Sequence, residues 1–121
     1  MDGGEPADLA YPWAQLCSDA ADDALAAAGL IVLATSAREP VVVDRRLRPD
    51  ATVLAVGAHA VDTRELHEHA LRDAQVIVED SGAARWEAGD VAIAVERGTL
   101  AWDGVVTMAE VVRGEVALDP A

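Results

Sequence analysis

Small and polar residues directly follow two apolar runs in the sequence. Thr35 and Ser36 come after "LIVLA", and Gly57 comes after "TVLAV". Hydroxyls and a glycine at the carboxyl end of a strand are typical of a ligand site, because glycine lets the backbone approach a ligand closely. The structural alternative is that the hydroxyls cap backbone groups and that Gly57 only turns the chain. The residues by themselves leave both interpretations open.

His59, two residues after Gly57, is the candidate for acid–base chemistry at the second of these strand ends. An imidazole changes its charge near neutral pH and could pass a proton to a reacting nitrogen. A loop histidine without any role fits the same position equally well. His67 and His69 lie two residues apart in an expected helix and therefore on different faces, which argues against shared metal ligation. We expect no metal site.

Size and charge narrow the class of protein. The chain has 121 residues, 52% of them hydrophobic, which is enough for one core in a single domain. Its 22 acidic residues against nine basic ones give a formal net charge of -13, which argues against binding to nucleic acid or to an anionic membrane surface. No apolar run reaches the roughly 18 residues that span a bilayer.

The cysteine content and the first residues indicate the compartment. Cys17 is the only cysteine, so an internal disulfide is excluded, and the start "MDGGEPADLAYPW" lacks the pattern of a signal peptide. We therefore expect a cytoplasmic protein. Residues 1–17 show no clear period and are interpreted as a lead-in loop or a poorly ordered segment.

Helices and strands are expected to alternate from residue 18 onward. A helix begins at the capping Ser18 and ends at Gly29, and a second one follows a capping box formed by Asp62 and Glu65. The run "LIVLAT" has no polar alternation, which predicts a strand covered on both faces. Further strands are expected at "PVVVD", "ATVLAV" and "QVIVED".

The last third of the chain is expected to be mostly helical. "SGAARWEAGD" indicates a short helical or turning segment. "VAIAVERG" fits a strand or a buried helix, and we favour the helix. In "TMAEVVRG", a capping box of Thr107 and Glu110 starts a helix that Gly114 ends.

This order of elements predicts an α/β fold: a partial Rossmann-like domain, half of a doubly wound parallel sheet with flanking helices. In such sheets ligands bind beyond the carboxyl ends of the strands. None of the nine glycines stands in a G-x-G pattern, so the half that would hold a dinucleotide's phosphates has no counterpart here.

Four stretches carry a family resemblance in the same order along the chain: "GLIVLATSAREPVV", "LRPDATVLAVGAHAVDTREL", "AQVIVEDSGAARWEAGD" and "MAEVVRGE". From about Asp19 to Asp119, the sequence resembles the second half of the NAD(P)-binding domain of the ornithine cyclodeaminase and mu-crystallin family. The resemblance implies that residues 18–121 form the C-terminal half of a Rossmann-like domain. It also implies an NAD(P) cofactor, an amino acid or cyclic imine as substrate, and a homodimeric parent enzyme.

The resemblance also assigns site residues. It places on the nicotinamide side of the cofactor Ala34, Thr35, Ser36, Val56, Gly57 and Ala58. Cyclodeaminases carry an aspartate after the Gly-Ala pair, where this chain has His59, and then "Pro-Gly-Lys", where it has Val61, Asp62 and Thr63. The motif "D-x-R-E-L" is similar to mu-crystallin and related reductases instead. Imine reduction is therefore expected rather than ornithine cyclodeamination, with His59 as the candidate catalytic residue.

The resemblance leaves parts of the family's active site without a counterpart. The glycine-rich loop, the substrate-binding Arg and Lys side, and the C-terminal return to the dimerisation domain all lack matching segments. We therefore expect the chain alone to be inactive. Three explanations remain open: a fragment, a decayed remnant, or a small domain retained for binding. The alternative function is a noncatalytic interaction module that keeps the half-Rossmann fold.

Overall fold

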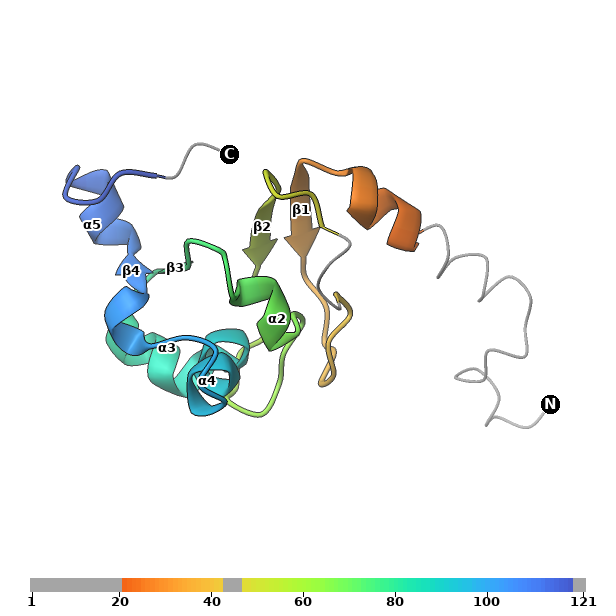
Figure 1. Ribbon diagram of the computed structural model, residues 1–121. Coiled ribbons are helices and arrows are strands. Elements are labelled where there is room, and N and C mark those ends of the chain that lie inside the picture. Colours follow the sequence, from red (N-terminus) through yellow and green to blue (C-terminus); the bar gives the residue numbers. More distant parts are fainter. Residues whose placement is uncertain (1–20, 43–46, 119–121) are drawn as a thin grey trace.

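The computed structural model describes residues 21–42 and 47–118, and its helices and strands alternate (Figure 1). Residues 21–27 are helical. The elements after them are β1 (Leu30–Leu33), β2 (Thr52–Ala55), α2 (Glu68–Leu71), β3 (Ile77–Val78), α3 (Ser81–Glu87), α4 (Gly89–Glu96), the 3-10 helix η2 (Trp102–Gly104), β4 (Val106–Thr107) and α5 (Met108–Val112). The expected lead-in 1–17 and the cap at Ser18 lie outside the described residues.

All paired strands in the described part of the chain are parallel. β1 pairs with β2 in a register that runs from Leu30 opposite Thr52 to Leu33 opposite Ala55. β3 pairs with β4 after a connection through α3, α4 and η2. The α/β class with parallel strands is thus confirmed, although the strands form two short sheets of two strands each.

The segment "PVVVD", where a strand is expected, is described only in part. Val42 forms an isolated parallel bridge with Leu66, and residues 43 and 44 lie outside the described part. This bridge nevertheless brings the segment after β2 against the segment after β1.

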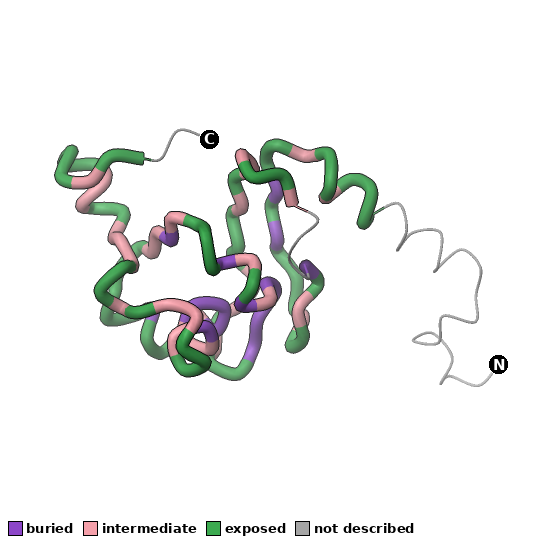
Figure 2. Tube along the Cα trace, in the orientation of Figure 1, coloured by how far each residue is buried: buried purple, intermediate pink, exposed green. Residues whose placement is uncertain are grey.

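The core lies on one side of the sheet formed by β1 and β2. Buried and exposed positions alternate along β1 (Figure 2). Ile31 and Leu33 are buried there, and the core also contains Val42, Leu66, Leu71, Val76, Val91 and Ala94. The other side chains of β1 are open: Leu30 is 62% exposed and Val32 is 59% exposed. The prediction of a strand covered on both faces is therefore wrong for the described chain, because the core and the helix over residues 21–27 pack on one face only.

The expected capping box of Asp62 and Glu65 is also wrong. Helix α2 begins only at Glu68, and His67 is its N-cap, with Nδ1 accepting a hydrogen bond of 3.2 Å from the amide of His69. The amide of Glu65 donates to the Asp90 carboxylate, and the amide of His67 donates to the carbonyl of Val42. In a helix that began at Asp62, the amide of His67 would donate within the helix, but here it is bound to another segment, and the helix begins later.

The helices of the last third confirm the sequence-based expectations. α3 occupies the segment expected to be helical or turning, and α4 resolves "VAIAVERG" in favour of the helix. Thr107 caps α5 by accepting a hydrogen bond of 3.3 Å from the amide of Glu110. Gly114 follows the helix with φ of 75°, a left-handed conformation that glycine adopts without strain. Among the described residues, no helix is long and apolar enough to cross a membrane.

Candidate functional site

The carboxyl ends of β1 and β2 lie next to each other and point toward the same loops (Figure 1). The amide of Val56 donates to the carbonyl of Leu33 at 2.9 Å, which is the last ladder bond between the strands. Beyond it, an exposed ion pair of 3.9 Å joins Arg38 to Asp62 across the two loops. The two segments that were predicted to contain site residues are therefore neighbours in space.

Glu65 connects these two strand ends from below the surface. Its side chain is fully buried, with 0% exposure. Oε2 accepts a hydrogen bond of 2.6 Å from the amide of Thr35, and Oε1 accepts one of 2.8 Å from the amide of Gly57. One carboxylate thus binds the backbone of both loops at once.

The space beside Gly57 is filled by these same neighbours. A Cβ atom at this position would lie 2.2 Å from the carbonyl oxygen of Thr35 and 2.4 Å from Oε2 of Glu65. Both distances are far below van der Waals contact, so a side chain cannot fit without moving a strand end. The internal packing therefore requires glycine here, which is a different reason from the close approach of a ligand.

Asp90, in the first turn of α4, holds Glu65 in turn. Its Oδ1 accepts hydrogen bonds from the amides of Glu65, at 2.6 Å, and Leu66, at 2.9 Å. Burial raises the pKa of Asp90, the two amide hydrogen bonds oppose that rise, and the nearby negative charge of Glu65 adds to it. Gly89 allows this contact, because a Cβ there would lie 1.8 Å from the carbonyl oxygen of Thr63. α4 thus fixes the segment that carries Glu65.

The residues predicted after β1 are exposed at this end. Ala34, Thr35 and Ser36 are all open to solvent. The hydroxyl of Thr35 accepts a hydrogen bond of 3.1 Å from the amide of Ala37, so the structural alternative of backbone capping is realised for this residue. The hydrogen of the same hydroxyl can still be donated to another acceptor.

The residues predicted after β2 form the other half of the same surface. Val56 is 67% exposed, and Ala58 is half-buried. The ring of His59 is exposed, and its Nδ1 lies 3.1 Å from the carbonyl oxygen of Gly57. A carbonyl only accepts, so Nδ1 carries the hydrogen in this contact, and Nε2 is the nitrogen left to exchange a proton with a ligand.

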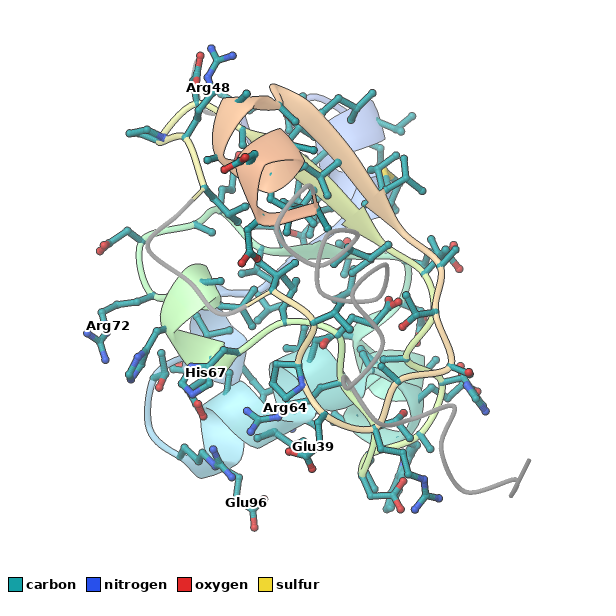
Figure 3. The ribbon with its side chains drawn as sticks, turned by 90° about the vertical axis from the view of Figure 1, so that its right-hand side faces the viewer. Glu39, Arg48, Arg64, His67, Arg72 and Glu96 are labelled. Carbon is teal, nitrogen blue, oxygen red and sulfur yellow. The ribbon has the colours of Figure 1, made fainter. Side chains whose placement is uncertain are left out.

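A second group of charges surrounds Glu68 at the start of α2. Figure 3 labels two of its members, Arg64 and His67. Glu68 is buried and forms ion pairs with Arg64 and Arg97, and its Oε2 lies 3.1 Å from Nε2 of His67. Burial acts to raise the pKa of Glu68, but the hydrogen bonds from the two arginines and the charge of His67 outweigh it and lower the pKa to about 2. These contacts hold α2 against the end of α4.

Metal ligation finds no support in the described part of the chain. Within residues 21–42 and 47–118, no group of three His, Cys, Asp or Glu side chains is arranged to hold an ion. The acidic and imidazole groups of Glu68 and His67 are used in the ion pairs just described.

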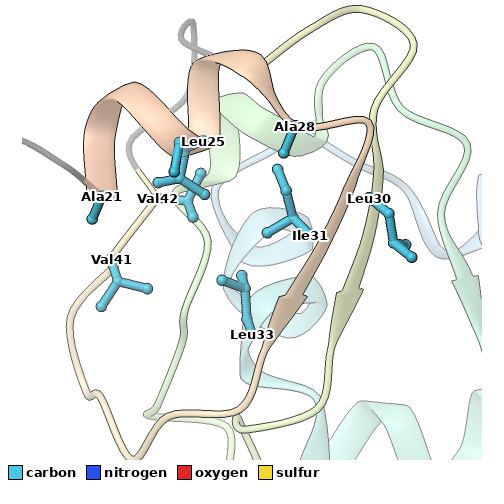
Figure 4. A pocket seen from close by; sticks show the side chains of 9 residues that line it. Ala21, Leu25, Ala28, Leu30, Ile31, Leu33, Val41 and Val42 are labelled. Carbon is cyan, nitrogen blue, oxygen red and sulfur yellow. The ribbon is translucent and has the colours of Figure 1, made fainter.

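An apolar groove of about 370 Å³ lies between the helix over residues 21–27, β1 and the segment at Val41 and Val42 (Figure 4). Every side chain around it is aliphatic, including Leu25, Ile31 and Leu33. Such a lining has no group that could transfer a proton or bind a charge. The groove therefore differs in character from the polar strand ends.

Sequence reasoning missed the two acids that organise the strand ends. Glu65 was interpreted as a helix cap, and Asp90 received no role. Glu65 belongs to the motif "D-x-R-E-L", and Asp90 directly follows Gly89, so both acids lie in short patterns of the sequence. Their hydrogen-bond partners lie up to 30 residues away: Glu65 binds Thr35, and Asp90 binds Leu66.

A protein-family model matches most of the chain. The model described as "Ornithine cyclodeaminase/mu-crystallin family" matches residues 14–118. The chain belongs to this family. The resemblance recognised in the four sequence stretches is thus confirmed.

Reductases are among the relatives with similar sequences. Delta(1)-pyrroline-2-carboxylate reductase 2 of Burkholderia ambifaria is 34% identical over 101 residues, which cover 84% of this chain and 30% of that protein. Ketimine reductase mu-crystallin of Mus musculus is 36% identical over 77 residues, or 64% of this chain and 24% of that protein. The chain therefore spans less than a third of the length of these relatives.

A solved structure supports the fold. The Delta(1)-pyrroline-2-carboxylate reductase of Thermococcus litoralis, in complex with NADH and L-proline, superposes with a TM-score of 0.78 at 27% identity. The match covers 84% of this chain and 32% of that chain. The described residues thus correspond to part of a Rossmann-type reductase fold.

Proposed function

We propose that this chain forms the nicotinamide side of the NAD(P)H site in an imine reductase of the ornithine cyclodeaminase/mu-crystallin family. The observation that carries the proposal is the junction made by Glu65, which unites the ends of β1 and β2 into one surface. The candidate residues Ala34, Thr35 and Ser36 lie on one loop of this surface, and Val56, Gly57 and Ala58 lie on the other. The names of the relatives support reduction of a cyclic imine.

The side chains at the strand ends fit a nicotinamide ring. Val56 offers an exposed apolar side chain against which a flat ring could pack, and small residues leave room beside it. Thr35 and Ser36 supply hydroxyls that could bind the carboxamide.

The local charge at the strand ends affects the binding of an anionic nucleotide. The chain carries a net charge of -13, which would repel such a ligand in general. Both oxygens of Glu65 face inward, however, and Asp62 is paired with Arg38. Exposed Glu39 lies in the loop after β1, so these contacts reduce the negative charge between the loops without removing it.

His59 is the proposed proton donor. The bound nicotinamide would supply a hydride to the imine carbon, and reduction then requires one proton at the imine nitrogen. With Nδ1 held by the carbonyl of Gly57, the protonated ring of His59 can deliver this proton from Nε2. The substitution His59→Gln should leave the affinity for NADH within about twofold of wild type, because this role does not include holding the cofactor.

The experiment that tests the proposal compares two halves of the cofactor. The ¹⁵N-labelled chain is titrated with NADH, with reduced nicotinamide mononucleotide and with 5′-AMP, and the amide signals are followed by NMR. We expect the first two ligands to shift the signals of residues 34–36 and 56–59 saturably, and 5′-AMP to leave them unchanged. Calorimetry with NADH and NADPH gives the dissociation constants. A folded chain that shows no saturable shift with either nicotinamide ligand would overturn the proposal.

A noncatalytic interaction module is the second candidate, and the open face of the first sheet favours it. Leu30, Val32, Leu54 and Val56 are all between 48% and 67% exposed. Paired positions on parallel strands place Val32 beside Leu54 on one face. If association is the function, light scattering should show a stable complex that Val32→Glu disrupts. Nicotinamide binding by a monomer would exclude this candidate.

A further inference from the structure

We infer that Glu65 is the positioning residue of the cofactor surface: its buried carboxylate fixes the distance between the ends of β1 and β2 without touching the ligand. This inference rests on the proposed function. In the sequence, Glu65 is recognisable only as part of the short motif "D-x-R-E-L".

The hydrogen-bond pattern at the strand ends is the first argument. In a continued parallel ladder, the amide of Thr35 would donate to the carbonyl of Val56. Instead, the ladder stops at the bond from Val56 to Leu33, and the amide of Thr35 turns to Oε2 of Glu65 at 2.6 Å. The carboxylate therefore takes over where direct pairing ends.

The second argument is the sharing of one carboxylate by both strands. Oε1 binds the amide of Gly57 at 2.8 Å, eight residues before Glu65 in sequence, while Oε2 binds the amide of Thr35, thirty residues before it. Each anchored amide is flanked by candidate cofactor contacts, Ala34 and Ser36 in one loop, Val56 and Ala58 in the other. Movement of the carboxylate would thus change the spacing of the whole surface.

Glu65 is itself held firmly by its surroundings. Its side chain is fully buried, so the surroundings restrict its rotation. Its amide donates to Asp90 at 2.6 Å, and its carbonyl accepts from the amides of Val41 and Val42. A preorganised support of this kind lowers the cost of ordering loops when a ligand binds.

The test replaces the carboxylate by an amide of the same shape. In Glu65→Gln, one of the two acceptor oxygens becomes an NH₂ group, which cannot accept from a backbone amide. One strand end is then released while the volume is kept. The matched control is Glu96→Gln, which removes the same charge from an exposed position at the end of α4 (Figure 3). It corrects for the general effect of charge on binding of an anionic nucleotide.

A second control separates positioning from loss of stability. Leu71→Ala removes a buried core side chain from α2, away from the strand ends, and lowers the stability of the chain. NADH affinity is then compared at a temperature at which all variants are folded. If Glu65→Gln does not fold, Glu65→Asp replaces it, because the shorter acid keeps the charge and cannot reach both amides.

Two readouts are measured on each variant. We expect the dissociation constant for NADH to rise about tenfold in Glu65→Gln, as for loss of one hydrogen bond to a charged acceptor, and less than about twofold in both controls. We also expect the amide that loses its acceptor, that of Thr35 or that of Gly57, to move upfield and to exchange faster with solvent in Glu65→Gln alone.

The outcomes distinguish the two proposals. Unchanged affinity in Glu65→Gln would overturn the positioning role, and so would equal weakening in Leu71→Ala. An altered amide at Thr35 or Gly57 in a chain whose wild type does not bind NADH would confirm the junction between the strands but overturn the proposed function. Altered amides together with weaker binding support both.

Discussion

The two parallel sheets of this chain end in different ways. After β3, Asp80 caps α3 at once, with Oδ1 accepting a hydrogen bond of 2.8 Å from the amide of Ala83. Thr107, the last residue of β4, caps α5 in the same manner. After β1 and β2, by contrast, loops follow, and a buried carboxylate from farther along the connection after β2 ties them together.

This difference shows two solutions to one problem, the unpaired backbone groups at a strand end. Where a helix follows immediately, a side chain within three residues provides the cap, and the end is occupied by the helix itself. Where loops follow, the surface stays open for a ligand but needs a distant residue to give it shape. Residue Glu65 and its partner Asp90 meet that need.

The largest effect on stability is expected from Gly89→Ala. This change disturbs the contact of α4 with the segment that carries Glu65. The new Cβ would lie 1.8 Å from the carbonyl oxygen of Thr63 and 2.4 Å from that of Ala60. Because both obstacles are backbone atoms, the loop must move, and the free energy of unfolding should fall by more than about 4 kcal/mol. Urea unfolding measures it. Gly104→Ala, with no atom within 4 Å of its Cβ, is the control, and an equal loss there would refute the argument.

Glu68→Gln should be the next most damaging change. It leaves Arg64, which is almost fully buried, without its carboxylate partner. Loss of one member of a buried ion pair should lower the free energy of unfolding by about 3 kcal/mol. The same urea titration applies, with Glu110→Gln in α5 as a control of equal charge change. Similar urea midpoints for the two variants would show that the ion pairs of Glu68 contribute no more to stability than the charge of Glu110.

Acid should weaken the same cluster in a defined range. The pKa of Glu68 is lowered from 4.5 to about 2 in the folded chain, so its stabilisation is present above about pH 4.5 and is lost as the pH falls toward 2. The raised pKa of Asp90 acts in the opposite sense, since protonation relieves its cost of burial. Melting temperatures measured from pH 6 to pH 2 should therefore fall more steeply in wild type than in Glu68→Gln. Parallel curves would contradict this assignment.

Removal of the local cap of α3 should lower the free energy of unfolding less than Gly89→Ala, which displaces the support of the open strand ends. In Asp80→Ala, the amide of Ala83 loses its acceptor, and the free energy of unfolding should fall by about 1 kcal/mol. Asp80→Asn keeps an acceptor oxygen and should retain most of the stability. If Asp80→Ala weakened nicotinamide binding as much as Glu65→Gln does, the contrast between the two sheets would fail.

The smallest effect is expected from Arg38→Ala. Its ion pair with Asp62 joins the two open loops, but both side chains are more than 60% exposed and the atoms are 3.9 Å apart. Such pairs contribute between 0 and about 0.5 kcal/mol. A melting temperature within about 1 °C of wild type is expected, whereas a large drop would mean that Glu65 is not the main link between the strands.

The same contrast explains what could be predicted from the sequence. Thr107 with Glu110 was recognised as a cap because both partners lie within one turn. The order of strands and helices and the exposed candidates after each apolar run also follow from local patterns. Asp62 and Glu65 have the spacing of a capping box as well, yet Glu65 serves residues 35 and 57 instead. A pairing across thirty residues leaves no local pattern, so it became visible only in three dimensions.

Gly57 has an evolutionary consequence of its own. Any side chain at this position meets two obstacles, the carboxylate of Glu65 and the carbonyl oxygen of Thr35. A change at position 65 could remove the first obstacle, but no substitution can remove a backbone oxygen. A second mutation therefore cannot make room for a side chain at position 57. Descendants of the chain that keep the spacing of β1 and β2 must keep the glycine.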